Sequence, residues 1–307
     1  MTDTTRAGFV ALIGEPNAGK STLLNRMVGA KVSIVTHKVQ TTRARIRGIA
    51  IGGESGEAQL VFIDTPGLFK PRRRLDRAMV AAAWTGAGDA DIVVLMIEAH
   101  RGISEGVKAI LASLEERTGG GKVALAINKI DKVKTEALLA LTSEMNERYP
   151  FAETFMISAE RGHGVKALKT WLAGEVPAGP WLYPEDQIAD LPMRNIAAEI
   201  TREKLTLRLH QELPYELTVE TENWEERPDG SCRIDQVVYV ARDGHKGIVL
   251  GKKGETAKAV NTAARLELEE FLGRRVHLFV QIKVRKNWLE EKERYSEMGL
   301  EFKDGNA

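Results

Sequence analysis

Apolar runs alternate with polar, helix-like stretches through the first half of the chain. Runs of four to seven mostly apolar residues occur at 9–13, 60–63, 91–97, 122–127 and 154–157. Such runs are typical of strands that are buried on both faces of a parallel sheet. The segment 44–51 instead alternates with a period of two, which is typical of an edge or antiparallel strand. The sequence therefore predicts an α/β fold with a doubly wound, mostly parallel sheet.

The second half of the chain shows a different order of elements. A helix is expected over about 193–210, on apolar positions that include Leu205, Leu207 and Leu209. Two strands are expected at 216–220 and 234–240. A glycine-containing segment at 247–254, a helix at 255–271 and a last strand at 276–284 follow. The predicted order is α-β-β-α-α-β, which is that of a second, smaller α+β domain.

Proline and glycine are concentrated at 174–180, where they indicate a linker. We therefore predict a first domain at 1–176, a linker at 177–192, and a second domain at 193–307 that includes a C-terminal helix. A length of 307 residues is sufficient for two domains with separate cores.

Composition excludes several classes of protein. Hydrophobic residues make up 43% of the chain and charged residues 28%, as in an ordinary globular protein. Because 44 basic residues nearly balance 43 acidic ones, any nucleic-acid binding must depend on a local patch. The single cysteine, Cys232, excludes an internal disulfide and favours a reducing compartment. No apolar run approaches the roughly 18 residues of a membrane span, and residues 1–6 lack an apolar signal core, so we expect a cytoplasmic protein.

Residues 14–21 match the phosphate-binding loop G-x-x-x-x-G-K-[ST] at every fixed position. The residues are Gly14, Glu15, Pro16, Asn17, Ala18, Gly19, Lys20 and Ser21. The loop follows the run 9–13 and precedes a helix that is expected from Thr22 to near Gly29. Backbone N–H groups in such a loop surround phosphates, the lysine reaches the β- and γ-phosphates, and the Ser21 hydroxyl binds Mg²⁺. The alternative is a glycine-rich turn that matches by chance.

Two further motifs follow predicted buried strands. Asp64, Thr65, Pro66 and Gly67 come directly after the run 60–63. The Asp64 carboxylate is placed to hold a water ligand of Mg²⁺, and the Gly67 N–H can approach a γ-phosphate because glycine has no Cβ.

Asn128, Lys129 and Asp131 come after the run 122–127. A carboxylate at Asp131 can accept hydrogen bonds from N1–H and the N2 amine of guanine, and adenine offers neither donor at that edge. Lys129 would lay its alkyl stem on the base, and Ser158 and Ala159 would offer a backbone N–H to the guanine O6. Because parallel strands of an open α/β sheet bind ligands at their carboxyl ends, these motifs predict a site for GTP or GDP with Mg²⁺.

The segment 247–254 contains a Gly-Lys-Lys-Gly loop between two predicted helices, and in this order of elements it resembles a type II KH domain. Such domains bind the backbone of about four single-stranded nucleotides. The glycines permit close approach of RNA, and the remaining residues supply charge or an apolar groove: Lys246, Ile248, Val249, Leu250, Gly251, Lys252, Lys253, Gly254 and Lys258. The alternative is a helix-joining turn with solvated lysines.

The motifs in their order, together with Thr41-Thr42-Arg43, resemble the five guanine-nucleotide motifs of translation-factor-type GTPases. The segment 38–43 is similar to the effector loop of the bacterial Era family, although Val39 stands where that family usually has proline. The resemblance implies a P-loop GTPase domain in which Thr42 closes over Mg²⁺ and the γ-phosphate. Thr41 is the competing metal ligand. The implied catalytic set is Lys20, Thr42, Asp64 and Gly67.

Two positions bear on hydrolysis. Leu68 follows Gly67 at the position where Ras-like enzymes have the glutamine that orients the attacking water, and leucine cannot do this. Asn17 resembles the residue that holds K⁺ in potassium-activated relatives of this superfamily, which would let a cation partly replace an arginine finger. The alternative is that Asn17 only supports the loop.

The resemblance to the Era family covers nearly the whole chain. It implies a monomeric GTPase that assists 30S subunit assembly and 16S rRNA maturation, with its KH domain on the 3′ end of 16S rRNA. The alternative is a GTP-regulated signalling scaffold, peripheral on the cytoplasmic face of the inner membrane, that contacts lipid through the arginines at 72–74 or through Trp288, Leu289, Tyr295 and Met298. Acidic residues at 290, 291 and 293 weaken that alternative.

Overall fold

A computed structural model of the chain describes residues 5–36, 46–71, 74–118, 121–190, 192–210, 213–286, 288, 291–292, 295 and 300–302. The chain divides into two compact units, which are described separately. The N-terminal unit comprises residues 1–33, 39–190 and 296–307, and the C-terminal unit comprises 34–38 and 191–295.

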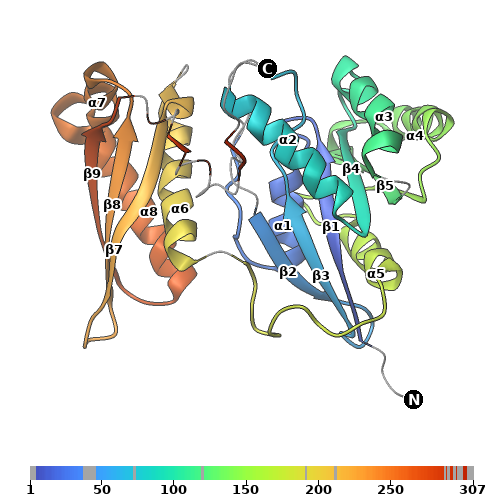
Figure 1. The fold of residues 1–307 in the computed structure, drawn as a ribbon, viewed down its shortest axis with the longest axis horizontal. Helices are drawn as coiled ribbons and strands as arrows, with labels where there is room; N and C mark the ends of the chain where they lie inside the picture. Colours follow the sequence, from blue (N-terminus) through green and yellow to red (C-terminus); the bar gives the residue numbers. More distant parts are fainter. Residues whose placement is uncertain are drawn as a thin grey trace. The chain divides into compact units, whose positions relative to one another are not determined.

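The described part of the N-terminal unit is built on a six-stranded sheet with the order β2-β3-β1-β4-β5-β6 (Figure 1). The strands are β1 (Arg6–Gly14), β2 (Ile46–Gly52), β3 (Ala58–Asp64), β4 (Ile92–Glu98), β5 (Lys122–Asn128) and β6 (Glu153–Met156). β2 is antiparallel to β3, and the other neighbouring strands are parallel. The predicted doubly wound, mostly parallel sheet is confirmed, and so is the antiparallel edge strand.

Helices cover both faces of this sheet, which explains why its central strands are uninterrupted apolar runs. The helices are α1 (Lys20–Val28), α2 (Arg74–Gly88), α3 (Glu105–Thr118), the short η1 (Ile130–Lys132), α4 (Thr135–Arg148) and α5 (Val165–Glu175). Side chains of α2, α3 and α4 share one core with odd-numbered residues of β1, β4 and β5, such as Leu95. Even-numbered neighbours such as Leu12 and Val94 are also fully buried, because successive side chains of a strand point to opposite faces.

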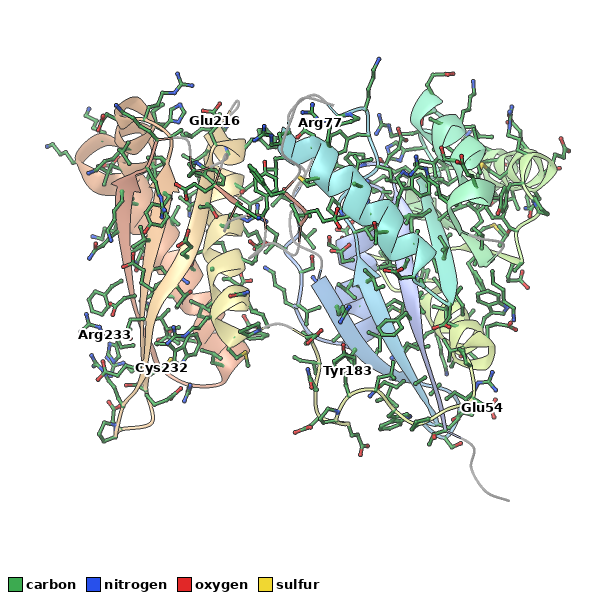
Figure 2. The ribbon with its side chains drawn as sticks, viewed as in Figure 1. Glu54, Arg77, Tyr183, Glu216, Cys232 and Arg233 are labelled. Carbon is green, nitrogen blue, oxygen red and sulfur yellow. The ribbon has the colours of Figure 1, made fainter. Side chains whose placement is uncertain are left out.

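Within the predicted linker, residues 188–190 pair with the edge strand β2 through an isolated antiparallel bridge between Gly48 and Ala189. The Ile49 N–H donates to the Ile188 carbonyl at 2.9 Å, and the Asp190 N–H donates to the Arg47 carbonyl at 3.0 Å. The Arg47 guanidinium also contacts the Asp190 carboxylate at 3.0 Å, and Tyr183 lies on the same segment (Figure 2). These contacts satisfy backbone groups that an edge strand would otherwise leave open. The boundaries of the domains and the linker remain predictions.

The C-terminal unit has a three-stranded sheet with the order β7-β8-β9 among its described residues. Its elements are α6 (Met193–Arg208), η2 (Leu213–Tyr215), β7 (Leu217–Glu226), β8 (Cys232–Val240), α7 (Asp243–Leu250), η3 (Lys252–Gly254), α8 (Glu255–Leu272) and β9 (Val276–Val284). β7 is antiparallel to β8, and β8 is parallel to β9. The lone Cys232 is buried at the start of β8 (Figure 2). The predicted succession α-β-β-α-α-β is present.

One position of the predicted apolar face of α6 differs. Leu205 and Leu209 are in the core with Leu217 and Val238, whereas Leu207 is 48% exposed. Residues four apart share a helix face and residues two apart do not, so Leu207 points away from the core. The helix also ends at Arg208, before Pro214. Across the described stretches, no helix combines the length and apolar character that crossing a membrane requires.

Leu205→Ala is expected to reduce the free energy of unfolding of the C-terminal unit by about 3 kcal/mol, because it leaves a cavity in a packed core. Leu207→Ala on the same helix is the matched control and should change it by less than about 0.5 kcal/mol. Hydrogen exchange of the β8 amides measures both values. Equal protection in the two variants would contradict this placement of α6.

Candidate functional site

The carboxyl ends of β1, β3, β4 and β5 lie along one edge of the parallel sheet, and the predicted nucleotide motifs lie there. The loop 14–21 follows β1, Asp64 ends β3, and Asn128 ends β5. Hydrogen bonds join these segments directly. The Leu68 N–H donates to the Gly14 carbonyl at 2.9 Å, and the Asn128 side-chain amide donates to the Ala18 carbonyl at 2.8 Å. Three motifs that are far apart in sequence therefore form one site.

At two positions of the phosphate loop, only glycine fits. A Cβ on Gly14 would lie 2.3 Å from the Met96 carbonyl oxygen, and one on Gly19 would lie 2.2 Å from the Asn128 amide nitrogen. Both glycines have positive φ, 148° and 98°. The loop leads into the N-terminus of α1, and a helix N-terminus is a favourable place for an anion.

Lys20 is held inside this loop. Its ammonium is buried and donates to the Gly14 carbonyl at 3.1 Å and to the Glu15 carbonyl at 3.0 Å. Desolvation by burial lowers the pKa of Lys20 to about 8, and the charges of Asp64, Glu15 and Glu98 oppose that shift. The negative charge of a phosphate in the loop would further stabilise the Lys20 ammonium. The site therefore favours an anionic ligand.

Asp64 and Ser21 form the oxygen-rich part of the site. The Ser21 hydroxyl donates to Asp64 Oδ2 at 2.8 Å. Ser33, which the sequence analysis did not single out, donates to the same oxygen at 2.8 Å. Its own N–H is held by the Asn25 side chain at 2.9 Å, so the contact depends on packing rather than on a motif.

Carboxylate and hydroxyl oxygens are the ligands that Mg²⁺ prefers, and this donor set fits that ion. No group of three or more His, Cys, Asp or Glu side chains in the described stretches is arranged to hold a metal. Val39, Thr41 and Thr42 lie outside the described residues.

The segment after β3 packs against the phosphate loop. The Thr65 hydroxyl donates to the Leu12 carbonyl at 2.6 Å. A Cβ on Gly67 would lie 2.7 Å from the backbone nitrogen of Pro16, so only glycine fits there. Leu68 is buried in the core, so its side chain is unavailable to a water molecule at the phosphates.

The two predicted base-recognition loops are tied together. The Ala159 N–H donates to Asn128 Oδ1 at 2.9 Å, and the Ser158 hydroxyl donates to Asp131 Oδ1 at 2.7 Å. The Ser158 hydrogen bond, aided by the charges of Arg161 and Lys132, holds the pKa of Asp131 below its usual value. Asp131 therefore stays ionised, as acceptance from a guanine edge requires.

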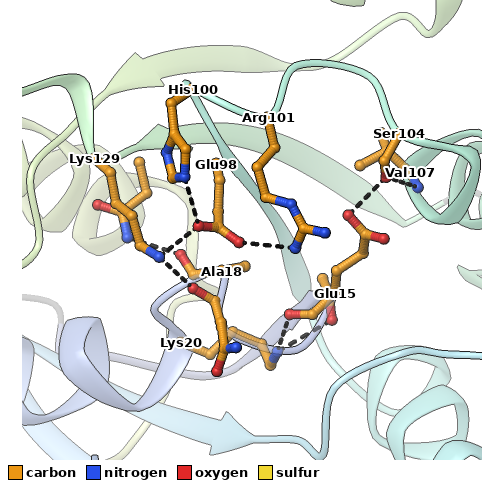
Figure 3. Close-up of polar contacts among 12 residues, drawn as sticks. Glu15, Ala18, Lys20, Glu98, His100, Arg101, Ser104, Val107 and Lys129 are labelled. Carbon is orange, nitrogen blue, oxygen red and sulfur yellow. Dashed lines mark hydrogen bonds and ion pairs between the residues drawn. The ribbon is translucent and has the colours of Figure 1, made fainter. Parts of the chain in front are cut away.

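Two charged residues that no motif predicted support these loops. Arg26 on α1 donates to the Ala159 carbonyl at 3.2 Å and to the Glu160 carbonyl, which fixes the loop after β6. Glu98 at the end of β4 contacts the Lys129 ammonium, as Figure 3 shows. Glu15, in a variable position of the phosphate loop, accepts from the Ser104 hydroxyl at 2.7 Å. Only tertiary contacts identify Arg26 and Glu98, whereas Glu15 belongs to the predicted loop.

The predicted RNA-binding loop joins α7 and α8. Its backbone has positive φ at Gly251, Lys253 and Gly254, and a Cβ on Gly251 would lie 2.9 Å from the Thr256 nitrogen. The side chains of Lys252 and Lys253 are exposed, as is that of Lys258, and Lys246 is half-buried.

Two of the three apolar residues of this region face solvent. Ile248 is 58% exposed and Leu250 is 38% exposed. Val249 is instead 1% exposed and belongs to the core of the unit. The prediction that Val249 lines a groove is corrected, because consecutive helical residues point in different directions.

The fold and the joined loops define a P-loop GTPase domain followed by a KH domain. A family model described as "50S ribosome-binding GTPase" matches residues 9–129, and one described as "KH domain" matches residues 212–289. GTPase Era of Dinoroseobacter shibae is 77% identical over 304 residues, which cover 99% of this chain and 98% of that protein. GTPase Era of Mesorhizobium japonicum is 62% identical, with 98% and 96% covered. The chain belongs to the Era family, and it is a GTPase.

Two solved structures are similar over the same extent. One is a variant of Aquifex aeolicus Era bound to GDP·AlF₄⁻, and the other is Era in complex with MgGDPNP and nucleotides 1506–1542 of 16S ribosomal RNA. Each is 35% identical, has a TM-score of 0.89, and covers 96% of this chain and 99% of its own. The expected fold and family are thereby confirmed.

The lowered pKa of Lys20 predicts proton uptake on nucleotide binding. The pKa of about 8 should rise when phosphates enter, so GDP binding at pH 8 should take up about half a proton. Affinity for GDP is then retained below pH 8 and decreases as pH rises above it. Titration calorimetry at pH 8 in two buffers with different heats of ionisation measures the uptake. Identical heats in the two buffers would rule it out.

Proposed function

We propose that this GTPase binds RNA and assists 30S subunit assembly and maturation of the 3′ end of 16S rRNA. The observation that carries the proposal is the occurrence, in one Era-family chain, of a guanine-nucleotide site and a Gly-Lys-Lys-Gly loop with two exposed lysines. The similar Era complex with a 16S rRNA fragment supports RNA as the ligand of the second unit.

The proposed nucleotide site uses the motif residues at the carboxyl edge of the sheet. They are residues 14–22, 64–67, Asn128, Lys129, Asp131, Ser158 and Ala159. Ser21 and Asp64 would hold Mg²⁺, with Thr42 as the further ligand that the family resemblance implies. The metal would neutralise charge that develops on the phosphates. The similar Era complex with MgGDPNP supports this assignment.

Hydrolysis in this site is proposed to depend on charge stabilisation rather than on a side-chain base. Leu68 is buried and cannot orient water, which leaves Lys20, the metal ligands and the Gly67 N–H as the groups near the phosphates. K⁺ held by Asn17 remains part of the proposal. The Asn17 backbone is left-handed, with φ 67°, which is compatible both with a cation ligand and with a structural turn.

The RNA-binding surface is proposed to consist of the exposed residues of the loop and its flanking helices. Gly251 and Gly254 allow the RNA backbone to approach, while Lys246, Lys252, Lys253 and Lys258 supply positive charge. Ile248 and Leu250 are available to bases. Because whole-chain charge is nearly balanced, this local patch carries the electrostatic part of binding.

The membrane alternative gains no support from the described residues. Trp288 is buried, and its indole N–H donates to the Glu216 carbonyl at 3.3 Å. Tyr295 is also buried. The other candidate residues for lipid contact, at 72–73, 289 and 298, lie outside the described residues, and Arg74 packs over the Phe302 ring. A cytoplasmic, monomeric protein remains the expectation.

Asp131→Asn should weaken GTP binding by up to about 10⁴-fold, because asparagine offers a donor where guanine needs an acceptor. The affinity for xanthosine triphosphate should decrease much less. Competition against a fluorescent GDP analogue measures both affinities. Asp235→Asn, which changes a carboxylate on β8, is the control. Unchanged GTP affinity in Asp131→Asn would contradict the assignment of the base site.

Lys252→Asp with Lys253→Asp should abolish binding of an oligonucleotide from the 16S rRNA 3′ end and leave basal GTP hydrolysis unchanged. Both side chains are exposed and both glycines are kept, so folding should persist. Any residual binding should show a salt dependence shallower by roughly 0.7 per lost phosphate contact. Lys134→Asp with Lys166→Asp, an exposed pair in the N-terminal unit, is the charge-matched control. Wild-type affinity in the Lys252/Lys253 variant would refute the assignment of this loop as the RNA-binding surface.

A further inference from the structure

Glu98 is a buried carboxylate in the nucleotide site to which no motif assigns a role. It ends β4 directly beside Asn128 at the end of β5, and it is 7% exposed. We infer that Glu98 is a positioning residue that fixes Lys129 against the phosphate loop and thereby sets how long a guanine nucleotide stays bound. This inference rests on the proposed assignment of Lys129 to the guanine base.

The Lys129 ammonium joins two parts of the site that are far apart in sequence. Its Nζ lies 2.5 Å from Glu98 Oε2 and donates to the Asn17 carbonyl at 2.7 Å (Figure 3). The carboxylate comes from the end of a sheet strand, and the carbonyl comes from the phosphate loop. Lys129 thus links the base-recognition segment to the phosphate loop, with Glu98 as the fixed anchor.

Both backbone positions that this bridge connects are unusual. Lys129 has φ 62° and Asn17 has φ 67°, in the left-handed region that residues with a Cβ rarely adopt. Such conformations persist where surrounding contacts fix them. The ion pair with Glu98 is one such contact, so removing its charge should let Lys129 move before a nucleotide arrives.

The charges of the site also support a positioning role for Glu98. Lys20 and Lys129 are both cations of this site, and the buried Glu98 carboxylate is a nearby negative charge that offsets them. A neutral residue at position 98 would leave the two ammonium groups with less compensation. The organised arrangement that a nucleotide meets should then be lost, and part of the binding free energy would go into restoring it.

Two other basic side chains near Glu98 do not share this role. His100 Nε2 lies 3.5 Å from Oε2 and the Arg101 guanidinium lies 3.4 Å from Oε1, and both side chains are substantially exposed. Within the described part of the chain, both side chains contact Glu98 rather than Lys129 or the phosphate loop. Arg101→Ala is therefore a control that removes a partner of Glu98 and leaves its link to Lys129.

The test is a double-mutant cycle on the full chain with Glu98→Gln, Lys129→Met and the double variant. Glu98→Gln keeps the size of the side chain and removes its charge. The readouts are GDP affinity, the release rate of a fluorescent GDP analogue, and the nucleotide-free melting temperature. Arg101→Ala and Glu144→Gln, which removes an exposed carboxylate paired with Arg148 on α4, are the controls. Glu98→Asp, shorter by one methylene, provides a second variant if Glu98→Gln does not fold.

We expect Glu98→Gln to accelerate GDP release by about tenfold, with little change in the controls. In the Lys129→Met background the same change should have no further effect, because Glu98 acts through Lys129. A purely structural role would instead lower the melting temperature and add to the effect of Lys129→Met. Additive effects, or wild-type release in Glu98→Gln, would overturn the inference. Unchanged GDP affinity in Lys129→Met would instead refute the proposed base site.

Discussion

Burial of charge at the carboxyl edge of the parallel sheet is the constraint on which the N-terminal unit depends. Lys20, Asp64 and Glu98 are all buried there. An isolated buried charge is very costly, so each of them needs partners. Lys20 donates to the carbonyls of its own loop, Asp64 accepts from two serine hydroxyls, and Glu98 pairs with Lys129. The arrangement that makes these charges tolerable also prepares the site for a charged ligand.

The architecture of the sheet makes this concentration of charge possible. Parallel strands β1, β3, β4 and β5 end at the same edge, and the helices on both faces exclude water from the strands themselves. Loops that leave this edge meet one another, as the hydrogen bond from Asn128 to the Ala18 carbonyl illustrates. Glycine is required where another backbone approaches closely, at Gly14 and Gly67, and where the Asn128 side chain packs against Gly19. These contacts restrain the loops of the site, and such restraint reduces the ordering cost of binding.

The charges of the candidate site in the C-terminal unit are exposed, unlike those of the N-terminal unit. Its lysines need no buried partners because they are exposed on a tight turn between α7 and α8. The turn is made by positive φ at Gly251, Lys253 and Gly254. The core beneath it, which includes Val249 and Val260, holds the helices while the charged tip faces solvent. Such a surface suits a polyanion that is bound through its backbone.

The sequence by itself determined the fold class, the order of elements in both units and the residues of each motif. Uninterrupted apolar runs require a sheet covered on both faces, and the fixed spacing of Gly14, Lys20 and Ser21 specifies a phosphate loop locally. Only the tertiary structure decided which side chains support these motifs. Ser33, Arg26 and Glu98 lie in no local pattern, and each acts by reaching a group distant in sequence. The same limit applies to Leu207 and Val249. Both side chains are apolar, but the direction in which each points from its helix decides that Val249 is buried and Leu207 is exposed.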